Sequence, residues 1–212
     1  MCYQVLRIGV IVGCVAVLGG WGCSRGPTRV KPPGIDAAEA GRLALKEYDT
    51  NGDGVIDAAE LNKAPALKAS IKNLDASKDG NKDGKVSGQE ITARIENWQE
   101  QKVGRMSLMV KVTRRGQPLP GATVRFVHEK FLGDEVQDAE GVTDAEGYAN
   151  LNAPPDPNQP NLPGMHCGLY CVEITKQGDK IPAMYNTQTI FGQEVSNDAA
   201  GIQEGIKFDL KY

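Results

Sequence analysis

The 212-residue sequence predicts an α+β protein, in which an all-helical N-terminal part precedes an antiparallel β-sandwich. Between residues 35 and 103, apolar residues recur at helical spacing, and two acidic, glycine-containing segments interrupt them. From residue 107 onward, apolar and polar residues alternate, as they do in half-buried strands. Most of the 12 prolines follow residue 115, which indicates a turn-rich C-terminal half.

Composition is typical of a globular protein and disfavours one class of partner. Hydrophobic residues make up 40% of the chain, charged residues 24%, and the formal net charge is −3. Neither half carries a long run of one sign. We therefore expect no nucleic-acid partner.

The first 22 residues are expected to be a signal peptide. Arg7 supplies a positive charge, and residues 8–22 carry none. This length suits the apolar region of a signal peptide better than a membrane span, which needs about 20 apolar residues. Cys23 follows, at the start of a polar, proline-rich tether over residues 23–34. This arrangement resembles the lipidation site of bacterial lipoproteins, which predicts a chain anchored in the bacterial cell envelope and facing the periplasm or the surface.

Two alternatives to this anchor stay open, an uncleaved N-terminal anchor and an ordinary secreted protein. Cys14 also ends a sequence like a lipidation signal, but it would leave an apolar stretch of only about six residues. All these interpretations place the rest of the chain outside the cytoplasm.

Oxygen-bearing side chains occupy fixed positions in residues 49–60, which read DTNGDGVIDAAE. They stand first, third, fifth, ninth and twelfth, and Gly54 stands sixth, where the chain must turn through a left-handed conformation. Ca²⁺ takes six to eight oxygens, and the EF-hand loop supplies them from these positions and from the seventh backbone carbonyl. The expected ligands are Asp49, Asn51, Asp53, Val55 through its carbonyl, Asp57 and Glu60.

Residues 79–90, DGNKDGKVSGQE, repeat this pattern. Turn-forming residues alone would explain Asp, Asn and Gly in any order. They would not explain the same order twice, each time with an aliphatic eighth residue and a glutamate twelfth. Calcium is therefore predicted at both loops, with vestigial loops as the alternative. The expected ligands of the second loop are Asp79, Asn81, Asp83, Lys85 through its carbonyl, Ser87 and Glu90.

The residues flanking the loops predict an EF-hand pair over residues 35–103. Asp36 can cap a first helix, and Pro65 can open a later one. A dockerin, which also duplicates such loops, is disfavoured because it lacks a full entering helix and usually ends its loops with aspartate. A calmodulin-like sensor is disfavoured because residues 31–105 contain no methionine.

The second hand departs from the first where the chain enters the loop. With the loops aligned residue by residue, Asp75 and Lys78 stand in place of Leu45 and Tyr48, and DASK looks like a small insertion. The second loop also has fewer carboxylates and contains two lysines. We therefore expect the first loop to bind calcium more tightly.

Short strands separated by turns are expected over residues 106–212 and predict the β-sandwich. The expected strand regions are 108–113, 122–128, 141–151, 168–176 and 205–212. The stretches GQPLPGATVRFV, GVTDAEGYANL and GLYCVEIT resemble the carboxypeptidase regulatory-like, or transthyretin-like, domain of bacterial surface proteins. The whole arrangement is similar to bacterial EF-hand lipoproteins that carry such a domain. The resemblance implies a prealbumin/Ig-like sandwich with a structural, adhesive or carbohydrate-contacting role and no enzymatic activity.

Few residues suggest catalysis. His128 and His166 are the only histidines. Enzymes with a related sandwich, the hydroxyisourate hydrolases and intradiol dioxygenases, need histidine patterns that this chain lacks. We expect His128 to be an ordinary strand residue and the protein not to be an enzyme.

Three states are open to Cys167 and Cys171. In a straight strand the two residues would lie about 13 Å apart, beyond the reach of a disulfide. A bend at Gly168 would allow a disulfide bridge. Without a bridge, the cysteines would be two free thiols or would form a metal site with His166.

Together these observations predict a calcium-binding, lipid-anchored extracytoplasmic protein with a structural or adhesive β-sandwich. The alternative is a calcium-dependent recruitment module that docks a protein or a glycan.

Overall fold

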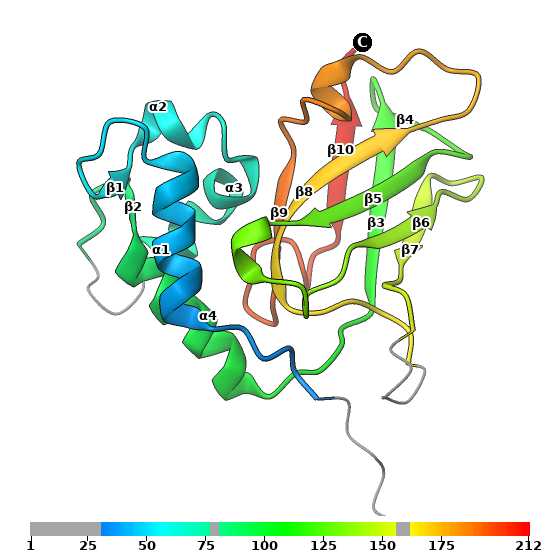
Figure 1. Cartoon of the computed structure of the whole chain (residues 1–212). Helices are drawn as coiled ribbons and strands as arrows, with labels where there is room; N and C mark the ends of the chain where they lie inside the picture. Colours follow the sequence, from blue (N-terminus) through cyan, green and yellow to red (C-terminus); the bar gives the residue numbers. More distant parts are fainter. Residues whose placement is uncertain (1–30, 77–80, 156–161) are drawn as a thin grey trace, which may run out of the picture.

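The computed structural model describes residues 31–76, 81–155 and 162–212, and it shows a helical part beside a part made of two sheets (Figure 1). The predicted signal peptide and Cys23 lie outside these residues. Within the described ranges, no helix is both long enough and apolar enough to cross a bilayer.

In the helical part, a helix lies on each side of each of the two predicted loops. Its helices are α1 (Ala37–Tyr48), α2 (Ala58–Leu61), α3 (Pro65–Leu74) and α4 (Gly88–Gln101), and its short strands are β1 (Val55–Ile56) and β2 (Val86–Ser87). Asp36 caps α1 by accepting the N–H of Glu39 at 3.0 Å, and Pro65 opens α3, as predicted. Gly41 and Gly88 let α1 and α4 touch, because a Cβ on Gly41 would lie 2.3 Å from the Gly88 carbonyl oxygen.

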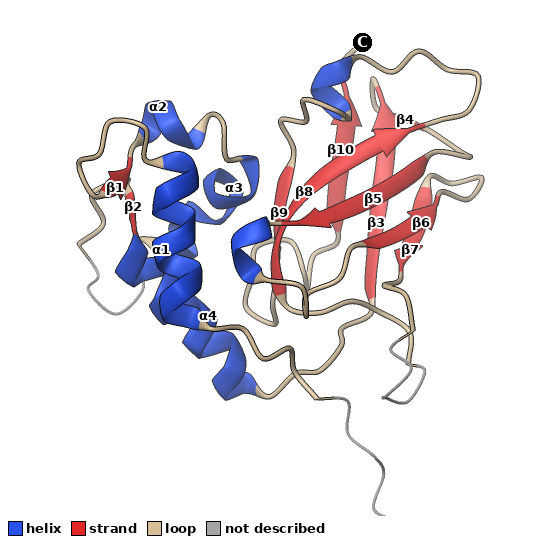
Figure 2. Cartoon of the chain, in the orientation of Figure 1, coloured by secondary structure: helices blue, strands red, loops and turns tan. Residues whose placement is uncertain are grey.

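The remaining strands form two four-stranded sheets (Figure 2). In the first, the order is β6 (Ala139–Val142), β5 (Thr123–His128), β8 (Gly168–Thr175) and β9 (Gly192–Val195), all antiparallel. In the second, β10 (Ile206–Leu210), β3 (Leu108–Arg114) and β4 (Gln117–Pro118) lie in order, and β7 (Tyr148–Leu151) also pairs with β3.

One strand pair differs from the antiparallel prediction. β10 runs parallel to β3, with Ile206 opposite Val110 and Leu210 opposite Arg114. The chain reaches β10 from β9, which belongs to the other sheet, so no hairpin imposes an antiparallel direction on it. The two short helices η1 (Lys130–Leu132) and η2 (Ala183–Tyr185) lie in connections between strands.

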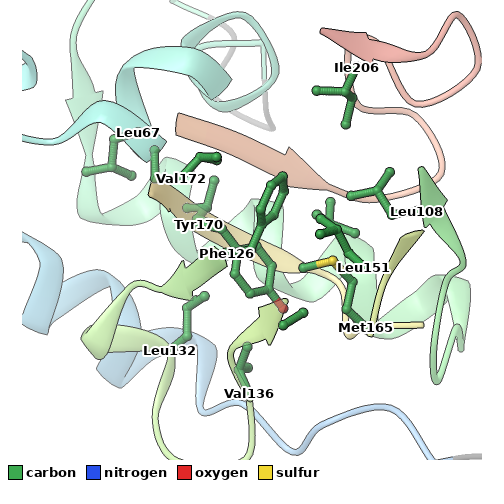
Figure 3. Close-up of a cluster of buried hydrophobic side chains, with 14 of the residues drawn as sticks. Leu67, Leu108, Phe126, Leu132, Val136, Leu151, Met165, Tyr170, Val172 and Ile206 are labelled. Atoms are coloured by element: carbon green, nitrogen blue, oxygen red, sulfur yellow. The ribbon is translucent and has the colours of Figure 1, made fainter. Parts of the chain in front are cut away.

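The two sheets and the helical part share one hydrophobic core. Between the sheets, the rings of Phe126 and Phe208 approach edge to face, with centroids 6.2 Å apart. Figure 3 shows Leu67 of α3 in the same buried cluster as Tyr170 and Val172 of β8. All three are fully buried, so the helices pack on the sheet rather than project from it.

α3 lies directly against the edge strand β9. A Cβ on Gly192 would lie 2.0 Å from the backbone oxygen of Pro65, so only glycine permits this approach. The helical part therefore packs on the face of the sheet at its edge strand β9.

A buried carboxylate on β9 joins the two parts. Glu194 is 3% exposed, and its Oε1 accepts hydrogen bonds from Nε of Arg94 at 2.7 Å and from Nε1 of Trp98 at 3.0 Å. Its Oε2 accepts one from Nδ2 of Asn73 at 2.9 Å. Helices α3 and α4 are thus tied to the same side chain of the sheet.

Replacement of Glu194 by alanine should be strongly destabilising, because it leaves the Arg94 guanidinium buried without its main counter-charge. We expect Glu194→Ala to lower the free energy of unfolding by about 3–5 kcal/mol, measured by urea denaturation at pH 7. Asp198→Ala is the matched control, since Asp198 pairs with the same guanidinium but its side chain is 52% exposed. Asp198→Ala should lower the free energy of unfolding by about 1 kcal/mol or less. Equal losses for the two variants would contradict a dominant role for the buried pair.

Candidate metal centre

The first predicted loop joins α1 to α2, and its first residue ends α1. Asp49 is the C-cap of α1, and its carboxylate accepts hydrogen bonds from the N–H groups of Gly52 at 2.6 Å and Gly54 at 2.9 Å. Gly54 has φ of 87°, the left-handed conformation predicted for the sixth position. Asp57 is the N-cap of α2 and forms a capping box with Glu60.

The last residue of this loop reaches back to its beginning. Oε1 of Glu60 accepts hydrogen bonds from the N–H groups of Thr50 at 2.7 Å and Asn51 at 3.2 Å, and Oε2 accepts one from Asp57 at 3.0 Å. These hydrogen bonds, of which the one from the N–H of Asp57 has the largest effect, lower the pKa of the Glu60 carboxyl.

The two loops pair with each other through their eighth residues. β1 and β2 are antiparallel, with Ile56 opposite Val86 and Val55 opposite Ser87. Ile56 and Val86 are both fully buried. The pairing fixes the two loops side by side on one face of the helical part.

In the second loop, the structure describes every predicted ligand except Asp79, which lies outside the described residues. Ser87 is the N-cap of α4 and forms a capping box with Glu90. The side chain of Asp83 accepts the N–H of Lys85 at 2.9 Å. Gly84 has φ of 77°, so this loop also turns through a left-handed sixth residue.

The donor atoms in both loops are chemically suited to calcium. Every predicted ligand is an oxygen, from carboxylates, an amide, a hydroxyl or a backbone carbonyl, and hard cations prefer such ligands. Within the described ranges, no group of three or more His, Cys, Asp or Glu side chains converges on one point. The loop carboxylates point instead at backbone N–H groups of their own loop.

Comparison with known proteins supports the prediction that the first loop and its flanking helices form an EF hand. The family described as EF hand matches residues 42–64, which contain the end of α1, the whole first loop and α2. No curated protein and no solved structure matches the chain. The chain therefore carries an EF hand near its N-terminus, and the ligand that this class implies is calcium.

The cysteines are separate thiols. Cys167 and Cys171 are both free, so the disulfide that a bend at Gly168 would have allowed is not formed. The Cys167 thiol lies 3.7 Å from Sδ of Met106, whereas Cys171 lies against Glu129. Burial raises the pKa of each thiol to about 12, which keeps both protonated and weakly reactive.

A polar cluster on the outer face of β5 was missed by the sequence analysis. Asp138 accepts a hydrogen bond from Nη2 of Arg125 at 2.6 Å and lies 2.7 Å from Nδ1 of His128. His128 is thus a strand residue with a carboxylate partner. The sequence offered no signal for Asp138, because it lies in the connection before β6.

A second missed residue, Glu129, lies between the first hand and the sheet. Its carboxylate is 5% exposed and accepts hydrogen bonds from the Tyr48 hydroxyl at 2.8 Å and the Cys171 thiol at 3.5 Å. Tyr48 immediately precedes Asp49, the first predicted calcium ligand. Burial raises the pKa of Glu129 to about 6, although the hydrogen bond from Tyr48 acts in the opposite direction.

The raised pKa of Glu129 predicts a pH-dependent stability. Above pH 6 the folded state buries a charge, and below about pH 4.5 the carboxyl is protonated in both folded and unfolded states. Relative to Glu129→Gln, the wild-type free energy of unfolding should rise by about 2 kcal/mol as the pH falls from about 7 to 4.5. Urea denaturation of both proteins across this range measures the difference. A constant difference would show that the Glu129 pKa is the same in both states.

Proposed function

We propose that this protein binds calcium at both loops, and that the bound calcium stiffens the helical part, which is packed on the two-sheet part. The observation that carries the proposal is the first loop, where an EF-hand match coincides with oxygen donors at all six predicted positions and a left-handed glycine at the sixth. The antiparallel contact between β1 and β2 supports a second site beside the first.

The contacts of the helices favour a structural role over a sensor that opens. Glu90 ends the second loop and lies in the first turn of α4, and Arg94 and Trp98 lie one and two turns further along the same helix. Both side chains bind the buried Glu194. A rotation of α4 that exposed an apolar groove would break these buried hydrogen bonds, which is costly.

Recruitment of a glycan or protein is a second candidate function. One observation favours it: an open hollow of about 580 Å³ lies beside β6, lined by Arg125, Asp138, Glu140 and Asn152 among others. These four polar side chains can hydrogen-bond a hydrophilic ligand, while Ala139, Ala153 and Pro154 add apolar surface to the same hollow. In either case the proposed role is binding rather than catalysis.

Calcium titration of loop variants tests the leading proposal. By isothermal calorimetry, wild-type protein stripped with chelator should bind two calcium ions. Glu60→Gln and Glu90→Gln should each remove one, because each loses the carboxylate that closes its loop. The first variant should lose the tighter site, since the first loop has more carboxylates. Absence of calcium uptake at millimolar concentration would refute the proposal. An apolar dye that binds only with calcium would favour recruitment.

We also propose that residues 1–22 form a signal peptide, that Cys23 is lipidated, and that residues 106–212 form a carboxypeptidase regulatory-like sandwich in the bacterial cell envelope. The support for the anchor is the sequence around Cys23. The support for the sandwich is the resemblance of its strand sequences together with two sheets that face each other across Phe126 and Phe208.

Substitution of the two N-terminal cysteines tests the anchor. When the full-length chain is expressed in a bacterium, the wild type should enter the detergent phase on phase partitioning, and Cys23→Ser should shift to the aqueous phase. Cys14→Ser is the matched control and should behave as the wild type does. Loss of the anchor with Cys14→Ser alone would move the lipidation site to Cys14.

A further inference from the structure

The helix that enters the second loop ends earlier than the sequence alignment of the loops implies. α3 ends at Leu74, and Asp75 is its C-cap, with its N–H donated to the Ile71 carbonyl at 2.8 Å. Asp49 holds the same place at the end of α1, where its N–H binds the Leu45 carbonyl at 2.9 Å. Measured from the helices, Asp75 therefore corresponds to Asp49.

The carboxylate of Asp75 also contacts its loop as the carboxylate of Asp49 does. Oδ2 of Asp49 accepts the N–H of Gly54 at 2.9 Å, and Oδ2 of Asp75 accepts the N–H of Gly84 at 2.9 Å. Both glycines are the left-handed sixth residues of their loops. Oδ1 of each aspartate accepts a further N–H from its own loop, at 2.6 Å in the first and 3.1 Å in the second.

Three hydrogen bonds from backbone N–H groups recur at the same positions of the two loops. The N–H of the fifth residue binds the third side chain at 2.8 and 3.2 Å, and the N–H of the seventh binds the fifth side chain at 3.1 and 2.9 Å. The N–H of the ninth binds the twelfth glutamate at 3.0 and 2.7 Å. Because these three hydrogen bonds fix the correspondence of the two loops from the third to the twelfth position, the contacts of Asp75 with Gly84 and Asp83 place it at the first position of its loop.

We propose that Asp75, rather than Asp79, supplies the first oxygen of the second calcium site. This inference rests on the proposed calcium binding and assigns one of its ligands. The donors of the second site are then Asp75, Asn81, Asp83, the Lys85 carbonyl, Ser87 and Glu90. The loop runs from residue 75 to 90, four residues longer than the first, and the extra residues lie between Asp75 and Asn81.

This assignment corrects the predicted correspondence between the two entering helices. Asp75 and Lys78 do not replace Leu45 and Tyr48; in the structure Ile71 and Leu74 stand at those places relative to the helix end. Leu74 is fully buried, as a core residue of an entering helix should be. Asp75 itself is 9% exposed, so its carboxylate faces the loop rather than solvent.

A pair of asparagine substitutions distinguishes the two aspartates. The parent is the full-length protein with Glu60→Gln, which should remove calcium binding at the first loop. Calorimetric titration of this parent with calcium chloride should show one remaining site. Adding Asp75→Asn should weaken this site by about tenfold or more, because a charged ligand becomes neutral. Adding Asp79→Asn should change the affinity by less than about twofold. Asparagine keeps one side-chain oxygen, which can accept the N–H of Gly84, and gives up the hydrogen bond from the N–H of Asp83. Thermal melting of each variant in chelator, compared with its parent, measures the cost of this lost hydrogen bond separately from calcium affinity.

Each result of this experiment decides the assignment. The role of Asp75 would be overturned if calcium affinity fell with Asp79→Asn alone, if it fell equally with both variants, or if it fell with neither. If the Glu60→Gln parent binds no calcium, the second site itself is absent and the proposed function fails there. That failure is separate from a wrong choice of aspartate, which leaves the parent site intact.

Discussion

The hydrogen-bonded ion pair between Glu194 and Arg94 is the contact on which the arrangement of this molecule depends. It is nearly excluded from water, and it ties α4 to β9 at a point where α3 also contributes Asn73. Two charges taken out of water are stable only when each finds its partners, so the pair fixes one geometry and penalises others. The shared hydrophobic core contributes most of the packing energy but is far less directional.

Each calcium loop is connected to one such interface carboxylate. Tyr48, the residue before the first loop, donates its hydroxyl to Glu129. Arg94, one turn beyond Glu90 at the end of the second loop, binds Glu194. Each loop therefore lies less than two helical turns from a carboxylate that is buried between the helical part and the two-sheet part. This geometry is the physical reason to expect calcium to stabilise the whole chain.

Local patterns could be predicted from the sequence, and contacts between distant residues could not. The cap at Asp36, the start of α3 at Pro65 and the left-handed turn at Gly54 follow from short-range rules and are confirmed. The parallel direction of β10 and the partners of Glu129 and Glu194 depend on residues about 80 to 120 positions away, for which a single sequence holds no signal. The end of α3 was mispredicted for another reason. The twelve-residue pattern that ends at Glu90 fits the sequence completely, so it gave no sign that α3 ends at Leu74 and that Asp75 caps it.

The longer second loop does not by itself make the second site weak. Closing a loop of sixteen rather than twelve residues costs only about 0.3 kcal/mol more chain entropy. Charge has a larger effect, because the first loop offers the carboxylates of Asp49, Asp53, Asp57 and Glu60, whereas the second has a serine at its ninth position and three lysines within its sixteen residues. Calcium affinity in such loops depends on the number of charged ligands. The difference in calcium affinity between the two sites should therefore arise from Ser87 and the lysines. Substituting aspartate for Ser87 should reduce this difference in affinity more than shortening the loop would.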